Sequence, residues 1–248
     1  KMLILIAVIS LLMKVLIIQL ITGFGYHIII PIYHQIIFQN TVKIMQRRTD
    51  QEQIWNPRTR LGSLVQSGKV TSLSQLFENG WKIKEYQIVN TLLPDLKSFV
   101  VDVGVVQKQT DAGESTKFKS VVAIGNNNGW FGVGTGKKPQ MRNAIDAATN
   151  NALINITPVK LGCGSWECRC GTSHSIPYRT IGKAGSVKVE LIPGPKGLGL
   201  VAGETIRNLL ELAGIKDSWT KTFGATATMP SVAQAVYNSI KELHSMSL

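Results

Sequence analysis

The chain is poor in the residues on which most catalytic sites depend. Its 248 residues include 3 Cys, 4 His and 15 Asp or Glu. His27 and His34 lie in a very apolar N-terminal stretch, and His244 lies close to the C-terminus. The sequence also lacks a nucleophile-elbow motif, a paired-carboxylate motif and a His-Glu-x-x-His motif. These absences argue against an enzyme, and no small-molecule substrate is expected.

Acidic residues are outnumbered by basic ones. The chain has 27 Lys and Arg and a net charge of +12. Residues 103–203 carry 12 basic and 5 acidic side chains, whereas residues 204–248 carry four of each. An excess of positive charge in one part of the chain favours a phosphate-bearing partner such as nucleic acid. An ordinary solvated basic surface is the alternative interpretation.

Cysteine is confined to one short segment. Cys163, Cys168 and Cys170 lie close together and are followed by His174. A small, odd and clustered set is unlike a secreted disulfide framework and indicates a reducing compartment. Three thiols and an imidazole are the donors that zinc prefers. No cofactor is required for the expected function, and the segment leaves two interpretations open: reduced thiols packed in a turn, or a structural zinc site.

The first 44 residues differ from the rest of the chain. They contain 13 Ile and no Asp or Glu, and residues 2–21 are almost wholly apolar. About 20 apolar residues are enough for a membrane-spanning helix, but the flanks do not fit a signal peptide. Three interpretations remain: a membrane anchor, an extension buried in a partner, or upstream sequence wrongly joined to a gene that begins at Met45. We favour the third, so a membrane partner is not expected.

The rest of the sequence predicts an α+β protein. Residues 45–97 read as a basic arm (46–60) followed by short helices at 71–77 and 85–93. Residues 98–160 read as one domain, with strands at 99–108, 117–125 and 130–136 and a helix at 139–154. Residues 161–177 form a Cys-rich loop. Residues 178–248 read as an α/β module, with strands at 186–192 and 219–223 and helices at 204–213 and 231–244.

Two glycine-rich segments resemble nucleotide-binding loops but fail the spacing tests. In 132–138 (GVGTGKK), a Walker loop would need Gly at Phe131 and a hydroxyl at Lys138. In 194–199 (GPKGLG), a correctly spaced Gly-x-Gly-x-x-Gly is missing, and the module is too short for a doubly wound fold. Glycines in 132–136 are expected to let RNA or a neighbouring helix approach closely. A nucleotide-dependent enzyme is therefore disfavoured.

An ordered series of motifs between Trp55 and Leu243 points to one protein family. The matching stretches are 55–62 (WNPRTRLG), 125–137 (GNNNGWFGVGTGK), 162–168 (GCGSWEC), 174–177 (HSIP), 182–187 (GKAGSV), 191–199 (LIPGPKGLG) and 212–217 (LAGIKD). On these residues, the chain resembles the ribosomal protein S-five family of the small subunit, in its archaeal and eukaryotic form.

The resemblance implies a double-stranded-RNA-binding-like domain of three antiparallel strands plus a helix. A small α/β C-terminal domain with a left-handed crossover follows it. The resemblance also implies a cytoplasmic, non-enzymatic constituent of the small ribosomal subunit. Such a protein binds rRNA and contributes to subunit assembly, to the path by which mRNA enters and to decoding accuracy. The implied partners are small-subunit rRNA, ribosomal proteins S-four and S-eight, and mRNA. A membrane-anchored basic module that binds anionic lipid is the alternative hypothesis.

The basic residues of the matched segments are the candidates for RNA contact. Lys137, Lys138 and Arg142 lie at the start of the 139–154 helix, where backbone amides already favour phosphate. The loop at 108–119 corresponds to the family's RNA-contacting loop. The full set of RNA-binding candidates is Arg58, Arg60, Lys108, Lys117, Lys119, Lys137, Lys138, Arg142, Lys183 and Lys196.

Overall fold

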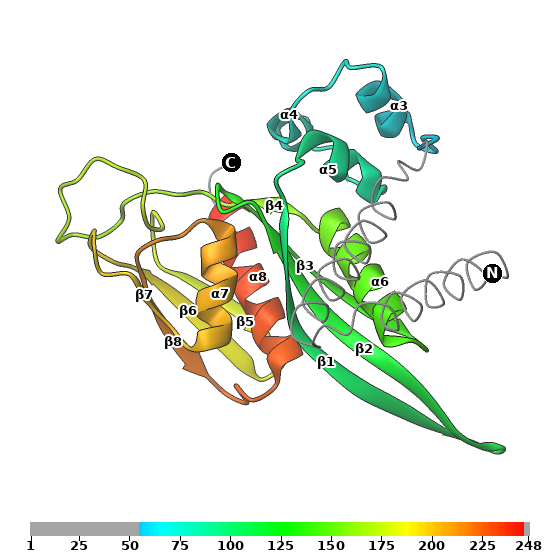
Figure 1. The fold of residues 1–248 in the computed structure, drawn as a ribbon. Coiled ribbons are helices and arrows are strands. Elements are labelled where there is room, and N and C mark those ends of the chain that lie inside the picture. The colour runs from blue at the N-terminus through cyan, green and yellow to red at the C-terminus, as the bar shows by residue number, and fades with distance from the viewer. Residues whose placement is uncertain (1–54, 246–248) are drawn as a thin grey trace, which may run out of the picture. The chain divides into compact units, whose positions relative to one another are not determined.

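The structure is a computed structural model, and it describes residues 55–245 (Figure 1). The expectations for the hydrophobic leader (1–44) and for most of the basic arm fall outside the described residues. Of the described residues, 57–245 belong to one compact unit. Within the part of the chain that is described, none of the helices has the length and apolar character needed to cross a membrane.

Three short helices precede the first sheet: α3 (Arg60–Gln66), α4 (Leu73–Glu78) and α5 (Tyr86–Leu92). The Thr59 hydroxyl accepts a hydrogen bond from the Gly62 amide at 3.1 Å and thereby caps α3. The Glu85 carboxylate accepts from the amides of Arg58 and Thr59 at 3.0 and 2.6 Å. Helices α4 and α5 match the predicted helices, whereas α3 was not predicted because its first residues read as part of the basic arm.

The first sheet is antiparallel, with strand order β1-β2-β3-β4. Its strands are β1 (Lys97–Thr110), β2 (Gly113–Gly125), β3 (Trp130–Lys138) and β4 (Thr157–Pro158). The β2–β3 turn uses two left-handed residues, Asn127 at φ 57° and Gly129 at φ 101°. Helix α6 (Met141–Ile154) follows β3 and packs on β2 and β3. The predicted arrangement of three antiparallel strands followed by a helix is confirmed, with two-residue β4 added at the edge.

The glycines of β3 lie directly beneath α6. Gly132, Gly134 and Gly136 alternate along one face of the strand, and Ala144, Ala148 and Ala152 repeat every four residues on the helix. A Cβ on Gly134 would overlap backbone atoms of Ala148 and Ala152. The glycine-rich segment therefore serves close helix–sheet packing, one of the two roles expected for it.

The second sheet has the order β5-β6-β8-β7. Its strands are β5 (Thr180–Ala184), β6 (Val187–Pro193), β7 (Leu200–Val201) and β8 (Ser218–Phe223). Helix α7 (Glu204–Ala213) connects β7 to β8, which run parallel, and α8 (Met229–Ser245) closes the fold. Helix α7 ends at Gly214, which has φ 88°. Strands β5 and β7 were not predicted, since both are short.

One hydrophobic core joins the two sheets. Val121 and Phe131 of the first sheet belong to the same buried cluster as Leu209 of α7, Val236 of α8 and Val189 of β6. Helices α7 and α8 therefore lie between the sheets, and α6 covers the opposite face of the first sheet (Figure 1). The order of layers is α6, first sheet, α7 with α8, second sheet. The predicted α+β fold with an additional α/β module is confirmed.

Candidate nucleic-acid interface and metal centre

Two lysines lie opposite each other on neighbouring strands of the first sheet. In the β2–β3 register, Lys119 lies directly opposite Lys137, and both side chains are exposed. Directly opposed side chains on an antiparallel pair have Cβ atoms about 5 Å apart, so two like charges repel there. The ion pairs found among residues 55–244 involve neither lysine. An uncompensated pair of this kind is well suited to an external anion.

Two further cations lie near the start of α6, but Lys119 and Lys137 point to the face of the sheet opposite this helix, since their neighbours Ser120 and Gly136 face it. Lys138 is the last residue of β3, and Arg142 lies in the first turn of α6; both are exposed. Gln140 occupies the N-cap position but makes no capping hydrogen bond through its side chain. The first amides of the helix, together with the helix dipole, favour a negatively charged group. We name Lys119, Lys137, Lys138 and Arg142 the α6 basic cluster.

The β1–β2 hairpin carries Lys108 and Lys117 away from this cluster. Both are exposed, with Lys108 opposite Ser115 and Lys117 opposite Val106. Ten residues lie between Lys108 and Lys119 along the hairpin, two of them in the turn. At the tip, the Glu114 carboxylate accepts a hydrogen bond from the Gln109 side chain at 2.6 Å. The hairpin therefore presents cations along its length rather than at one point.

The remaining RNA-binding candidates lie on other elements. Arg58 and Arg60 flank the start of α3, Lys183 lies on β5 opposite Lys188, and Lys196 lies in the glycine-rich loop before β7. All four candidates are exposed. The register thus brings Lys119 and Lys137 together on the face of the sheet opposite α6, whereas Lys138 alternates onto the face that α6 covers. It does not bring Lys183 or Lys196 to the same strands.

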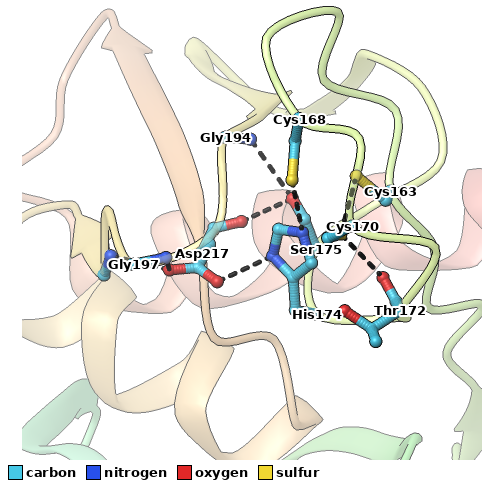
Figure 2. Close-up of polar contacts among 10 residues, drawn as sticks. Cys163, Cys168, Cys170, Thr172, His174, Ser175, Gly194, Gly197 and Asp217 are labelled. Carbon is cyan, nitrogen blue, oxygen red and sulfur yellow. Dashed lines mark hydrogen bonds and ion pairs between the residues drawn. The ribbon is translucent and has the colours of Figure 1, made fainter.

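The four predicted zinc ligands converge in the loop before β5 (Figure 2). The donor atoms of Cys163, Cys168, Cys170 and His174 all lie within 4.8 Å of one another. Cys170 Sγ lies 3.6 Å from Cys163 Sγ, and Cys168 Sγ lies 3.6 Å from His174 Nε2. Zn–S bonds of about 2.3 Å and Zn–N bonds of about 2.05 Å give tetrahedral edges of about 3.8 Å (S···S) and 3.6 Å (S···N). The donor set and its spacing therefore fit a tetrahedral zinc ion.

A hydrogen-bonded bridge closes the base of this loop. The amide of Gly162 donates to the Ser175 carbonyl at 2.8 Å, and the amide of Ser175 donates to the Gly162 carbonyl at 2.9 Å. A Cβ on Gly164 would overlap the Pro177 carbonyl, so the two sides of the loop pass very close to each other. The backbone itself brings the first and last ligands of the sequence together.

Asp217 supports the histidine from a distant part of the chain. Its Oδ2 atom lies 2.7 Å from His174 Nδ1, and both residues are buried. Its Oδ1 atom accepts hydrogen bonds from the amides of Gly197 and Gly199 at 3.1 and 2.8 Å. A carboxylate on Nδ1 fixes the tautomer in which Nε2 is free to bind a metal. The sequence interpretation missed Asp217, which lies 43 residues after His174.

The cysteines differ in acidity. Partial burial, reinforced by hydrogen bonds to Cys170 and Cys168, raises the pKa of the Cys163 thiol to about 11. Hydrogen bonding to Thr172, through its side chain and then its backbone, lowers the pKa of Cys170 to about 6. A lowered pKa favours the thiolate form of Cys170, the form that binds metal. Cys163 has to lose a proton when it becomes a ligand, so metal binding releases protons.

Comparison with known proteins identifies both parts of the fold. Residues 96–160 match the family described as "Ribosomal protein S5, N-terminal domain", and residues 182–247 match "Ribosomal protein S5, C-terminal domain". The proteins called "Small ribosomal subunit protein uS5" in Cenarchaeum symbiosum and Thermofilum pendens are each 52% identical to the chain. The first alignment covers 81% of the chain and 91% of the relative, and the second covers 77% and 94%. The relative of the same name in Staphylothermus marinus is 53% identical, over 77% of the chain and 89% of the relative.

The fold and the comparisons together define a two-domain ribosomal protein, which is a structural constituent of the ribosome and not an enzyme. The chain belongs to the ribosomal protein S5 family. The resemblance stated from the motifs is thereby confirmed.

Proposed function

We propose that the chain is a cytoplasmic constituent of the small ribosomal subunit that binds rRNA through the α6 basic cluster and the β1–β2 hairpin. The observation that carries this proposal is the pairing of Lys119 with Lys137 across two strands, without an acidic partner among the described residues. A phosphate between them relieves their repulsion and releases condensed counterions. The relatives' names, which place those proteins in the small subunit, support the choice of rRNA.

The proposal extends to the RNA-binding candidates outside the cluster. Lys108 and Lys117 on the hairpin, and Arg58, Arg60, Lys183 and Lys196 elsewhere, act as further phosphate contacts. Ribosomal proteins S-four and S-eight are the proposed protein neighbours, and mRNA is the proposed partner near its entrance. Through these contacts the protein contributes to subunit assembly and decoding accuracy.

We also propose a structural zinc ion bound by Cys163, Cys168, Cys170 and His174. The donor spacing described above supports it, as does the support that Asp217 gives to His174. Four protein ligands leave no open position, so the ion serves the fold and not catalysis. The ion would hold the 12-residue loop in one conformation beside the second domain.

Charge removal at the α6 basic cluster tests the RNA-binding proposal. The triple variant Lys137→Gln, Lys138→Gln, Arg142→Gln should bind an rRNA fragment more weakly, and the slope of log affinity against log salt should fall by about 3. The control variant Lys69→Gln, Arg207→Gln, Lys241→Gln removes equal charge from exposed positions elsewhere. Retention of the wild-type protein on small subunits through a high-salt sucrose gradient tests the assignment to that subunit. Equal slopes for the triple variant and wild type would refute the cluster as the contact.

A further inference from the structure

The second sheet has one face that the described elements leave open. Val187, Val189 and Leu191 of β6 point inward, where α7 and α8 pack on the sheet. The alternating residues of each strand therefore point outward. By the strand register, the outward residues are Arg179, Ile181 and Lys183 on or beside β5, Lys188, Glu190 and Ile192 on β6, Trp219, Lys221 and Phe223 on β8, and Val201 on β7. We name this set the open sheet face.

Large hydrophobic side chains gather on the open sheet face. Trp219 is 44% exposed, Phe223 50%, Ile181 41% and Val201 40%. These are four of the nine large hydrophobic residues found exposed in the described part of the chain. A folded protein rarely collects exposed apolar side chains on one surface unless that surface binds something.

The charges of the open sheet face are almost all positive. Lys183, Lys188 and Lys221 lie among the hydrophobic residues, and only Glu190 is acidic. Glu190 is buried and pairs with Arg179, so its charge is already compensated. Among the described residues of this face, no acidic side chain is therefore left to compensate the charges of the lysines. The field of the surface favours a negatively charged partner.

The two aromatic rings flank a lysine on one strand. Trp219, Lys221 and Phe223 lie on the same side of β8, with the Cα atoms of Trp219 and Phe223 about 14 Å apart along the strand. The Lys188 ammonium lies 5.7 Å from the centre of the Phe223 ring. Proteins that bind single-stranded RNA on a sheet stack unpaired bases on exposed aromatic rings. Cations between the rings contact the phosphates.

We propose that the open sheet face binds a single-stranded segment of RNA. Unpaired bases stack on Trp219 and Phe223, and the phosphates between them meet Lys188, Lys221 and Lys183. RNA is favoured over a protein partner because lysine is depleted from protein–protein interfaces, whereas it is frequent here. This second RNA surface is separate from the α6 basic cluster; it includes Lys183, one of the phosphate contacts proposed above, and in that respect rests on the proposed function.

Substitution of one ring in the full chain tests the proposal. The probes are a fluorescein-labelled 12-nucleotide oligouridylate and an RNA duplex of the same length. Trp219→Ala should weaken oligouridylate binding at least about fivefold and leave duplex binding unchanged. Trp81→Ala is the matched control, because Trp81 is 42% exposed and lies outside the open sheet face. Equal oligouridylate affinity for Trp219→Ala and wild type would overturn the proposal.

Cross-linking in intact small subunits separates RNA from a protein occupant. Brief ultraviolet irradiation should cross-link the peptide containing residues 218–223 to RNA. Protein cross-links at Lys188 and Lys221 without any RNA cross-link to that peptide would show that the face binds protein, contrary to the proposal. The triple variant of the α6 basic cluster should lose duplex binding while keeping oligouridylate binding. Loss of RNA binding at the α6 basic cluster and loss of RNA binding at the open sheet face can therefore be distinguished.

Discussion

Asp217 Oδ2 lies 2.7 Å from His174 Nδ1, while the other oxygen of the same carboxylate accepts two amides from the glycine-rich loop. A single buried side chain thus connects the Cys-rich loop to the segment that leads into β7. These contacts link the imidazole to two distant segments of the fold and set its orientation.

Asp217→Asn should disturb this arrangement with little change in volume. An asparagine has one acceptor oxygen and one amide group, so either His174 or the two glycine amides would face another donor. We expect zinc affinity to fall about 10- to 100-fold. Competition with a chromophoric chelator on the full chain measures the change. Glu211→Gln, an exposed acid on α7, is the control. Affinity of Asp217→Asn within twofold of wild type would contradict the orienting role.

Removal of one thiol should abolish the metal site. Cys168→Ser leaves three ligands, one fewer than the tetrahedron that zinc prefers in structural sites. Native mass spectrometry of the full chain should show one zinc for wild type and none for the variant. Ser173→Ala changes an exposed residue of the same loop and should keep the metal. The same metal content in Cys168→Ser and wild type would count against the site.

The convergence of Cys163, Cys168, Cys170 and His174 could be predicted from the sequence because they lie within 12 residues of one another. Asp217 could not, since its relation to His174 depends on how the chain folds over 43 intervening residues. The glycines of β3 show the same limit of prediction from sequence. Their spacing excluded a Walker loop, but the choice between RNA and a helix required knowledge of which residues of α6 face the strand. The sequence likewise predicted Lys119 and Lys137 separately, and only the β2–β3 register shows that they are opposite each other.

Gly134→Ala should destabilise the first domain strongly. The added Cβ would overlap backbone atoms of Ala148 and Ala152, so α6 would have to move away from β3. Forcing extra volume into a packed layer costs about 1–3 kcal/mol or more. Urea denaturation of the full chain measures the loss. Gly104→Ala on β1 is the matched control, because its Cβ would meet nothing within 4 Å. A midpoint for Gly134→Ala equal to that of Gly104→Ala would be inconsistent with this close packing.

Lys119→Glu should have opposite effects on folding and on RNA binding. The new carboxylate faces Lys137 directly, so a repulsive pair becomes an attractive one, with a gain of about 0.2–1 kcal/mol in the free energy of unfolding at low salt. The same change removes a phosphate contact, so the slope of log RNA affinity against log salt should fall by about 1. Urea denaturation and filter binding of the full chain measure the two effects.

Lys117→Glu is the control that separates the stability effect of Lys119→Glu from its effect on RNA binding. Lys117 lies opposite Val106 and not opposite a cation, so its replacement should bring no gain in stability. A stability gain in Lys119→Glu alone, together with weaker RNA binding, would show that the native lysine pair is kept for its ligand at a cost to the free protein. A Lys119→Glu variant that is more stable but binds RNA with the wild-type slope would mean that the phosphate lies elsewhere.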